Sequence, residues 1–139
     1  HLYGSESYLR EHGVPRTPAD LAAHNCLALS MIASDRQWYF EDAQGQGQTV
    51  AARGTLFSSS SLVLRQAAID GLGLAVLPSF CVAPYGEKAG LVRVLADYSR
   101  PTRDLHLLVS PDRRRPRRIR LFIDFALKWF DPVPWDPEA

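Results

Sequence analysis

The chain has 139 residues, of which 16 are basic and 15 acidic, and 46% are hydrophobic. These values are typical of a globular domain with one core, and they exclude a disordered chain, a collagen-like repeat and a disulfide scaffold. No stretch reaches the roughly 20 consecutive apolar residues that cross a bilayer, so we expect no membrane partner. No secretory signal opens the chain, and Cys26 and Cys81 fit no metal or redox spacing. We therefore expect a cytoplasmic protein with both thiols free.

Basic residues are concentrated in one run between Asp112 and Leu121. This run contains Arg113, Arg114, Arg115, Arg117, Arg118 and Arg120. It is either a phosphate-binding patch or the solvated start of an amphipathic helix, interrupted by Pro116. We favour the helix start, because proteins that bind nucleic acid usually spread their positive charge over a face.

Apolar runs of strand length alternate with helical patterns. In chain order, the sequence predicts a strand at Leu2–Tyr3, a short helix carrying Tyr8 and Leu9, a helix over Pro18–His24, a strand over Cys26–Leu29, a hairpin of Gln37–Phe40 with Thr49–Ala52, a strand over Gly54–Phe57, a helix from Ser59 or Ser60 to Gly71, a strand over Leu74–Leu77, a helix over Ser79–Lys88, strands over Leu91–Leu95 and Leu105–Val109, and a helix over Pro116–Phe130. This order indicates an α/β fold with a mostly parallel sheet, made mixed by the hairpin. Trp38 and Phe40 alternate along one strand and are expected to pack against the sheet.

The last predicted helix carries a continuous apolar stripe. Its members recur at helical spacing and are Ile119, Phe122, Ile123, Ala126, Trp129 and Phe130. Leaving the large side chains in water would cost on the order of 10 kcal/mol, so we expect the stripe to be covered. The cover is either its own sheet, reached by bending after Ser110, or a second copy of the chain. We favour a symmetric dimer centred on Phe122 and Trp129, because one contact then covers both stripes.

An ordered set of short motifs resembles one protein family. The set includes Ser7-Tyr8-Leu9 before His12-Gly13, Pro18-Ala19-Asp20-Leu21, His24-Asn25-Cys26-Leu27, Gly71-Leu72-Gly73-Leu74-Ala75-Val76-Leu77-Pro78 and Gly90-Leu91-Val92-Arg93-Val94-Leu95. Running from about Leu2 to Phe130, it is similar to the C-terminal part of the effector-binding domain of LysR-type transcriptional regulators.

The resemblance implies a type 2 periplasmic-binding-protein fold, in which two α/β subdomains joined by two crossover strands hold a small-molecule effector between them. Residues 1–110 would then form the second subdomain, with crossover strands at Leu2–Ser5 and Leu105–Val109. Residues 111–130 would form the C-terminal helix that in the family returns to the first subdomain, and residues 131–139 an irregular tail. The resemblance also implies a cytoplasmic homo-oligomer, and promoter DNA bound through a helix-turn-helix absent from this chain.

Two groups of candidate effector contacts follow predicted strands, where ligands bind in open α/β sheets. Ser30 and Met31 come after Cys26–Leu29, and the resemblance places polar effector contacts there. For either residue taken alone, a plain loop serine or a core methionine is slightly favoured. Pro78 and Phe80 come after Leu74–Leu77, and Phe80 either walls the cleft or packs in the core.

The third candidate group is Ser58, Ser59 and Ser60, directly before a predicted helix. The free N–H groups and partial positive charge of a helix N-terminus suit a carboxylate or another small anion. Capping of the helix accounts for one serine of the run, which continues to Ser61, but not for all four. We therefore expect Ser59 and Ser60 to face the cleft, and the effector to be anionic or polar and organic.

The leading hypothesis is a ligand-sensing module of a transcriptional regulator, not an enzyme. The alternative is a solute-binding protein of a transport system, which shares the fold and needs a signal sequence. An enzyme is a third possibility, but the sequence has no GxSxG elbow and no GxGxxG motif that opens a helix after a strand. The four histidines show no paired spacing. We therefore expect no catalytic residue, no metal and no cofactor.

Overall fold

The computed structural model describes residues 1–30, 36–83, 90–101, 106–110 and 116–131. Met31, the predicted helix beyond Ala83 and the tail beyond Asp131 lie outside the described residues. The chain divides into two compact units, His1–Pro101 and Thr102–Ala139.

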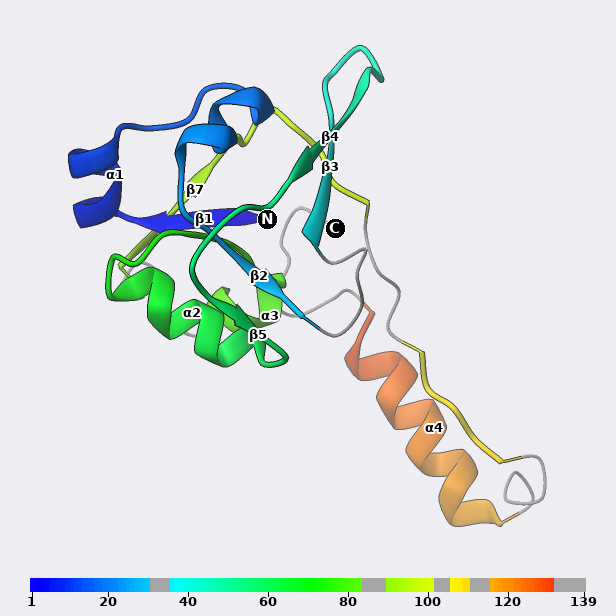
Figure 1. The fold of residues 1–139 in the computed structure, drawn as a ribbon. Coiled ribbons are helices and arrows are strands. Elements are labelled where there is room, and N and C mark those ends of the chain that lie inside the picture. Colours follow the sequence, from blue (N-terminus) through cyan, green and yellow to red (C-terminus); the bar gives the residue numbers. More distant parts are fainter. Residues whose placement is uncertain (31–35, 84–89, 102–105, 111–115, 132–139) are drawn as a thin grey trace. The chain divides into compact units, whose positions relative to one another are not determined.

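A five-stranded mixed sheet forms the centre of the first unit (Figure 1). Its strands, in the spatial order β5-β2-β6-β1-β7, are β5 (Phe57–Ser58), β2 (Cys26–Leu29), β6 (Leu74–Val76), β1 (Leu2–Ser5) and β7 (Leu91–Val94). Strands β5, β2 and β6 are parallel, whereas β1 is antiparallel to both β6 and β7. The predicted α/β class and the mixed sheet are confirmed. The source of the antiparallel pairing differs from the prediction, because it is the entry strand β1 and not the hairpin.

Alternate residues of the strands supply two cores on opposite faces of the sheet. Cys26, Ala28 and Leu74 belong to one core, together with residues of the first helices and the hairpin. Leu27 and Ala75 belong to the other core, together with residues of α2 (Ser61–Ile69) and α3 (Ser79–Val82). Because β2 and β6 are buried on both faces, they are continuous apolar runs in the sequence.

The hairpin is a separate two-stranded antiparallel sheet, β3 (Gln37–Glu41) with β4 (Gly47–Ala51). Trp38 pairs with Val50 and Phe40 with Gln48. The rings of Trp38 and Phe40 are only 3% and 1% exposed and lie in the core, as predicted from their alternation.

Local side-chain bonds fix the first two helices. α1 (Glu6–His12) begins where the Ser5 hydroxyl accepts a hydrogen bond from the Tyr8 N–H at 3.3 Å, and it ends at Gly13. The segment predicted as a helix over Pro18–His24 is the 3₁₀ helix η1 (Pro18–Ala23). The Asp20 carboxylate accepts the N–H groups of Arg16 and Thr17 at 2.9 and 2.8 Å, which holds the chain at the start of this short helix.

Asn25 joins three segments in front of β2. Its side-chain Nδ2 donates to the Leu72 carbonyl at 2.6 Å, and its side-chain Oδ1 accepts the Thr55 N–H at 2.8 Å. Gly73 passes so close that an added Cβ would lie 2.2 Å from the Asn25 carbonyl oxygen. This close approach and the left-handed backbone of Gly71 (φ 81°) explain why the turn after α2 uses glycine.

Two predicted strands differ in the structure. The strand expected over Gly54–Phe57 occupies only Phe57–Ser58, because the Thr55 N–H bonds the Asn25 side chain instead of joining a ladder. The crossover strand expected over Leu105–Val109 is wrong for the described part, since His106–Val109 has no strand structure. Both edges of β1 are already occupied by β6 and β7, so the sheet offers no position for a second crossover strand beside the first.

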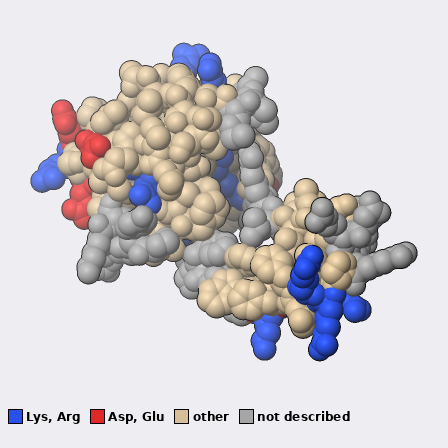
Figure 2. Space-filling model, turned by 90° about the horizontal axis from the view of Figure 1, so that it is seen from below, with Lys and Arg blue, Asp and Glu red and all other residues tan. Residues whose placement is uncertain are grey.

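The second unit contains α4 (Arg117–Trp129), which agrees with the predicted final helix within a residue at each end. In the view of Figure 2, Lys and Arg side chains gather on this unit. Phe122 and Trp129 are 57% and 60% exposed, so the predicted dimer through the stripe stays a prediction. Among the described residues, no helix combines the length and apolar character that a membrane crossing requires.

Candidate functional site

The carboxyl ends of the three parallel strands lie along one edge of the sheet, and several candidate residues follow them. Leu29 pairs with Ser58, and the Ser30 N–H donates to the Ser58 carbonyl at 3.1 Å. On the other side of β2, Leu27 pairs with Ala75, so Ser30 and Pro78 each lie three residues beyond a paired position. The structure thus brings Ser30, Ser58 and Pro78 to the same edge.

The serine run connects this edge to the N-terminus of α2. Ser60 is the N-cap residue, but its hydroxyl makes no capping bond. Instead, the Ser58 hydroxyl accepts the Ser60 N–H at 3.1 Å, so the expectation that a hydroxyl of the run caps the helix directly is wrong. This hydrogen bond joins residues two positions apart and stabilises the turn before the helix. The first-turn amides of an α-helix have no intrahelical acceptor, which suits the N-terminus of α2 to a small anion.

The serine side chains differ in exposure. Ser59 is exposed, whereas Ser58 and Ser60 are half-buried. The predicted orientation of Ser59 and Ser60 toward an effector cleft remains a prediction.

Phe80 lies in the first turn of α3 and is 52% exposed. The alternative in which it packs in the core is therefore wrong. Pro78, the N-cap residue of α3, is half-buried. An exposed aromatic ring two residues after a strand-end proline is suited to contact a ligand or a second surface.

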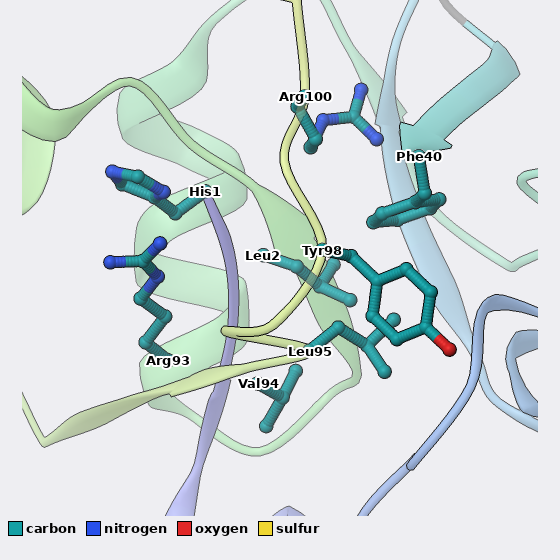
Figure 3. Close-up of a pocket in the computed structure, with 8 residues that line it drawn as sticks. All are labelled: His1, Leu2, Phe40, Arg93, Val94, Leu95, Tyr98 and Arg100. Carbon is teal, nitrogen blue, oxygen red and sulfur yellow. The ribbon is translucent and has the colours of Figure 1, made fainter. Parts of the chain in front are cut away.

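A pocket lies at the same end of the sheet, where the chain enters and leaves the first unit (Figure 3). It is lined by His1, Leu2, Phe40, Arg93, Val94, Leu95, Tyr98 and Arg100, is partly open to solvent, and has a cavity volume of about 10 Å³. This volume is far below the roughly 300–1,000 Å³ of ordinary small-molecule sites. Arg93, Tyr98 and Arg100 were not predicted from the sequence, because single polar residues in and after an apolar strand give no local signal of a site.

The two cysteines are poor nucleophiles. Both are free and buried. Burial raises the pKa of the Cys26 thiol to about 11, and burial also raises the pKa of the Cys81 thiol. Both side chains are therefore protonated at neutral pH and pack as small apolar groups.

The described residues offer no group of three or more His, Cys, Asp or Glu side chains arranged to hold a metal ion. Of the arginine run, Arg117, Arg118 and Arg120 are described, and all three are exposed at the start of α4. Their exposure agrees with the solvated helix start favoured in the sequence analysis, and Arg113, Arg114 and Arg115 lie outside the described residues.

Comparison with known proteins identifies the relatives of this chain. The family model described as the LysR substrate binding domain matches residues 1–131. The chain is 34% identical to the probable HTH-type transcriptional regulator LtrA of Klebsiella pneumoniae, over 89% of this chain and 41% of that protein. It is 31% identical to the HTH-type transcriptional regulator CrgA of Neisseria meningitidis, over 91% of this chain and 42% of that protein. The chain thus spans about two-fifths of these relatives.

Solved structures show the same likeness. The full-length Vibrio cholerae virulence activator AphB, a member of the LTTR protein family, matches 92% of this chain with a TM-score of 0.80 and 30% identity, and the match covers 43% of AphB. The CrgA regulatory domain from Neisseria meningitidis matches 91% of this chain with a TM-score of 0.72 and 28% identity, and the match covers 62% of that domain.

Proposed function

Because the chain belongs to the LysR substrate-binding domain family, with the periplasmic-binding-protein-like fold of its regulatory domains, we propose that it senses a small molecule for a DNA-binding transcriptional regulator. The relatives are regulators, which favours this function over transport of a solute. The same kinship argues against an enzyme, since the family's work is binding and not bond making. A regulator of bacterial promoters acts in the cytoplasm.

We assign residues 1–110 to the second subdomain of a two-lobed sensor, residues 111–130 to the helix that returns to the first, and residues 131–139 to a tail. The effector would contact Ser30, Met31, Ser58, Ser59, Ser60, Pro78 and Phe80. The observation that carries this proposal is the convergence of Ser30, Ser58 and Pro78 at the carboxyl ends of parallel strands, beside the N-terminus of α2.

The chemistry of this edge favours an anionic or polar organic effector. Hydroxyl groups and helix amides donate hydrogen bonds to carboxylate oxygens, and the α2 macrodipole attracts negative charge. An effector bound between two lobes would shift the equilibrium between the open and closed conformations of the sensor. The size of the shift would equal the difference between the effector's binding free energies for the two conformations. That shift would change how a homo-oligomer sits on promoter DNA, which it would bind through a helix-turn-helix outside this chain.

A thermal-unfolding screen with mono- and dicarboxylic acids, on the full regulator that contains this chain, tests the proposal. An acid at 100 times its Kd should stabilise the protein by about 2.7 kcal/mol. Ser58→Ala should weaken the response, whereas Thr49→Ala, an exposed hairpin substitution, should not. No stabilisation by any acid, or equal responses of Ser58→Ala and wild type, would contradict the proposed effector class or site.

The 139-residue chain alone should bind the same acid much more weakly. One lobe of a two-lobed pocket leaves much of the ligand surface in water, whereas small-molecule sites bury most of it. Calorimetry that gives micromolar affinity for the chain alone would show that the second lobe suffices.

A further inference from the structure

The segment by which the chain leaves the first unit is bonded to the hairpin. Ser99 and Glu41 form an isolated antiparallel bridge. The Ser99 N–H donates to the Glu41 carbonyl at 2.8 Å, and the Glu41 N–H donates to the Ser99 carbonyl at 3.0 Å. This pair attaches residue 99 to the end of β3, two residues before the boundary between the units.

Arg100 strengthens the same attachment through the aromatic rings of β3. Its guanidinium carbon lies 4.7 Å from the centroid of the Phe40 ring and 5.9 Å from that of Trp38. Both rings are almost fully buried, and the Nη1 nitrogen of Arg100 is shielded from water. A cation over an aromatic face is held more strongly when both are removed from water. Figure 3 shows Arg100 reaching toward Phe40 from the departing segment.

Leu95 begins a turn directly after β7. Its backbone is left-handed, with φ 53°, the only positive φ at a non-glycine position among the described residues. A leucine adopts this conformation only where its surroundings demand it. Here its side chain is 8% exposed in the core that also holds Phe40, and its carbonyl accepts the Tyr98 N–H at 3.0 Å. The turn, the bridge and the Arg100 contact therefore fix three successive points between β7 and residue 101.

The entry of the chain lies beside this exit and is bonded to the candidate site. Leu2 pairs with Val94, next to Leu95. The His1 terminal nitrogen donates to the Leu77 carbonyl at 3.0 Å, and the Leu77 N–H donates back to the His1 carbonyl at 2.9 Å. Leu77 precedes Pro78, so backbone bonds connect the strand end at the candidate effector edge to both chain connections of the first unit.

We propose that the hairpin β3–β4 is a clamp that fixes where the chain leaves the first unit, with Arg100 as its positioning residue. Without this attachment, residues 96–101 would follow β7 as a free connection to the second unit. With it, the exit keeps a fixed position relative to the sheet and to the candidate site. The role of the clamp in an effector response rests on the proposed function, whereas the clamp itself depends only on contacts within the first unit.

Hydrogen exchange of the Glu41 and Ser99 amides in the whole chain tests the clamp without any ligand. Arg100→Ala should accelerate exchange of both amides by about tenfold, because loss of a desolvated cation–π contact favours opening of the bridge. Exchange in β2 and β6 should stay unchanged. Arg100→Lys should restore part of the protection, and Arg100→Met, which keeps the aliphatic stem without the charge, should restore less.

Arg36→Ala is the matched control, because the Arg36 guanidinium makes a cation–π contact with a ring of β5 and not of β3, at 4.3 Å from the centroid of Phe57. It should leave the Glu41 and Ser99 amides unchanged. Unchanged exchange in Arg100→Ala would overturn the proposal. Equal acceleration across β2, β6 and the bridge would also overturn it, since Arg100 would then act on global stability alone.

Discussion

The hydroxyl of Tyr8 lies 3.2 Å from Nδ1 of His24, and the Asn25 N–H donates to the same hydroxyl at 2.9 Å. Which atom donates in the hydrogen bond between Tyr8 and His24 depends on the tautomer of the imidazole. Tyr8 is 2% and His24 is 9% exposed. This network joins α1 to the residues just before β2.

Tyr8→Phe should lower the free energy of unfolding by about 1–3 kcal/mol, because it removes the partner of the Asn25 N–H and of the His24 nitrogen in a buried site. Urea denaturation provides the measurement. Tyr39→Phe is the control, since it removes a hydroxyl that donates to the Glu41 carboxylate at 3.0 Å in the half-buried hairpin. Equal losses in the two variants would show that the buried network contributes nothing beyond an ordinary hydrogen bond.

Stability should fall as the pH drops below about 6.5, the usual pKa of histidine. Burial lowers the pKa of His24, and His12 lowers it further against a smaller opposite effect of Asp20. The unfolded chain therefore binds more protons than the folded chain as the pH falls from the usual pKa toward the lowered one, which favours unfolding. Urea midpoints between pH 7.5 and 5 should decline less steeply in His24→Gln than in wild type.

Native Cys26 and Cys81 should not react with a thiol-specific chromogenic disulfide at pH 8. Both are buried, and burial raises the pKa of Cys26 to about 11, so few thiolates form and reagent has no access. Two equivalents should react after unfolding in guanidinium. Ser110→Cys, at an exposed position, is the positive control and should add one fast equivalent in the native protein. Rapid reaction of a native cysteine would show that the unit opens locally around it.

Features specified by neighbouring residues were predictable from the sequence, and features specified by distant partners were not. The short helix that carries Tyr8 and Leu9 and the buried alternation of Trp38 and Phe40 depend on patterns within a few residues. The shortened β5 and the missing crossover strand depend on which edges are already paired. The Arg100 contact joins residues 60 positions apart in the sequence, so the segment around it gives no sign of the aromatic partner.

The candidate site was also predictable in part. Ser30 and Pro78 were predicted because they follow strands, and Ser58 because it precedes a helix; the pairing of β2 with β5 and β6 brings the three to one edge. The geometry of the turn before α2 decides which serine hydroxyl bonds the backbone there. The Ser58 hydroxyl does so by accepting the Ser60 N–H, and the N-cap Ser60 hydroxyl makes no capping bond.

Gly73→Ala should destabilise the first unit by about 2–3 kcal/mol, because its methyl group would meet the Asn25 backbone carbonyl in a packed site that must shift. Gly45→Ala is the comparison, since Gly45 has a φ of 77° but open space around its Cβ position, and its substitution should cost about 1 kcal/mol through backbone strain alone. Thermal unfolding of both variants gives the difference. A smaller loss for Gly73→Ala than for Gly45→Ala would mean that the turn before β6 relaxes without cost.

The apolar stripe of α4 should make the chain self-associate. Phe122 and Trp129, on the stripe, are 57% and 60% exposed, and covering each in a dimer would gain roughly 1.5–3 kcal/mol. A symmetric contact covers both copies of the stripe at once. Sedimentation of the 139-residue chain should therefore show a concentration-dependent dimer, and the double variant Phe122→Ser, Trp129→Ser should be monomeric. Leu127→Ser is the matched control, because Leu127 is similarly exposed at 62% but lies roughly 140–160° around the helix from Phe122 and Trp129. A wild-type monomer at high concentration would contradict the dimer, and so would loss of association in Leu127→Ser alone, because the contact would then use the other face of α4.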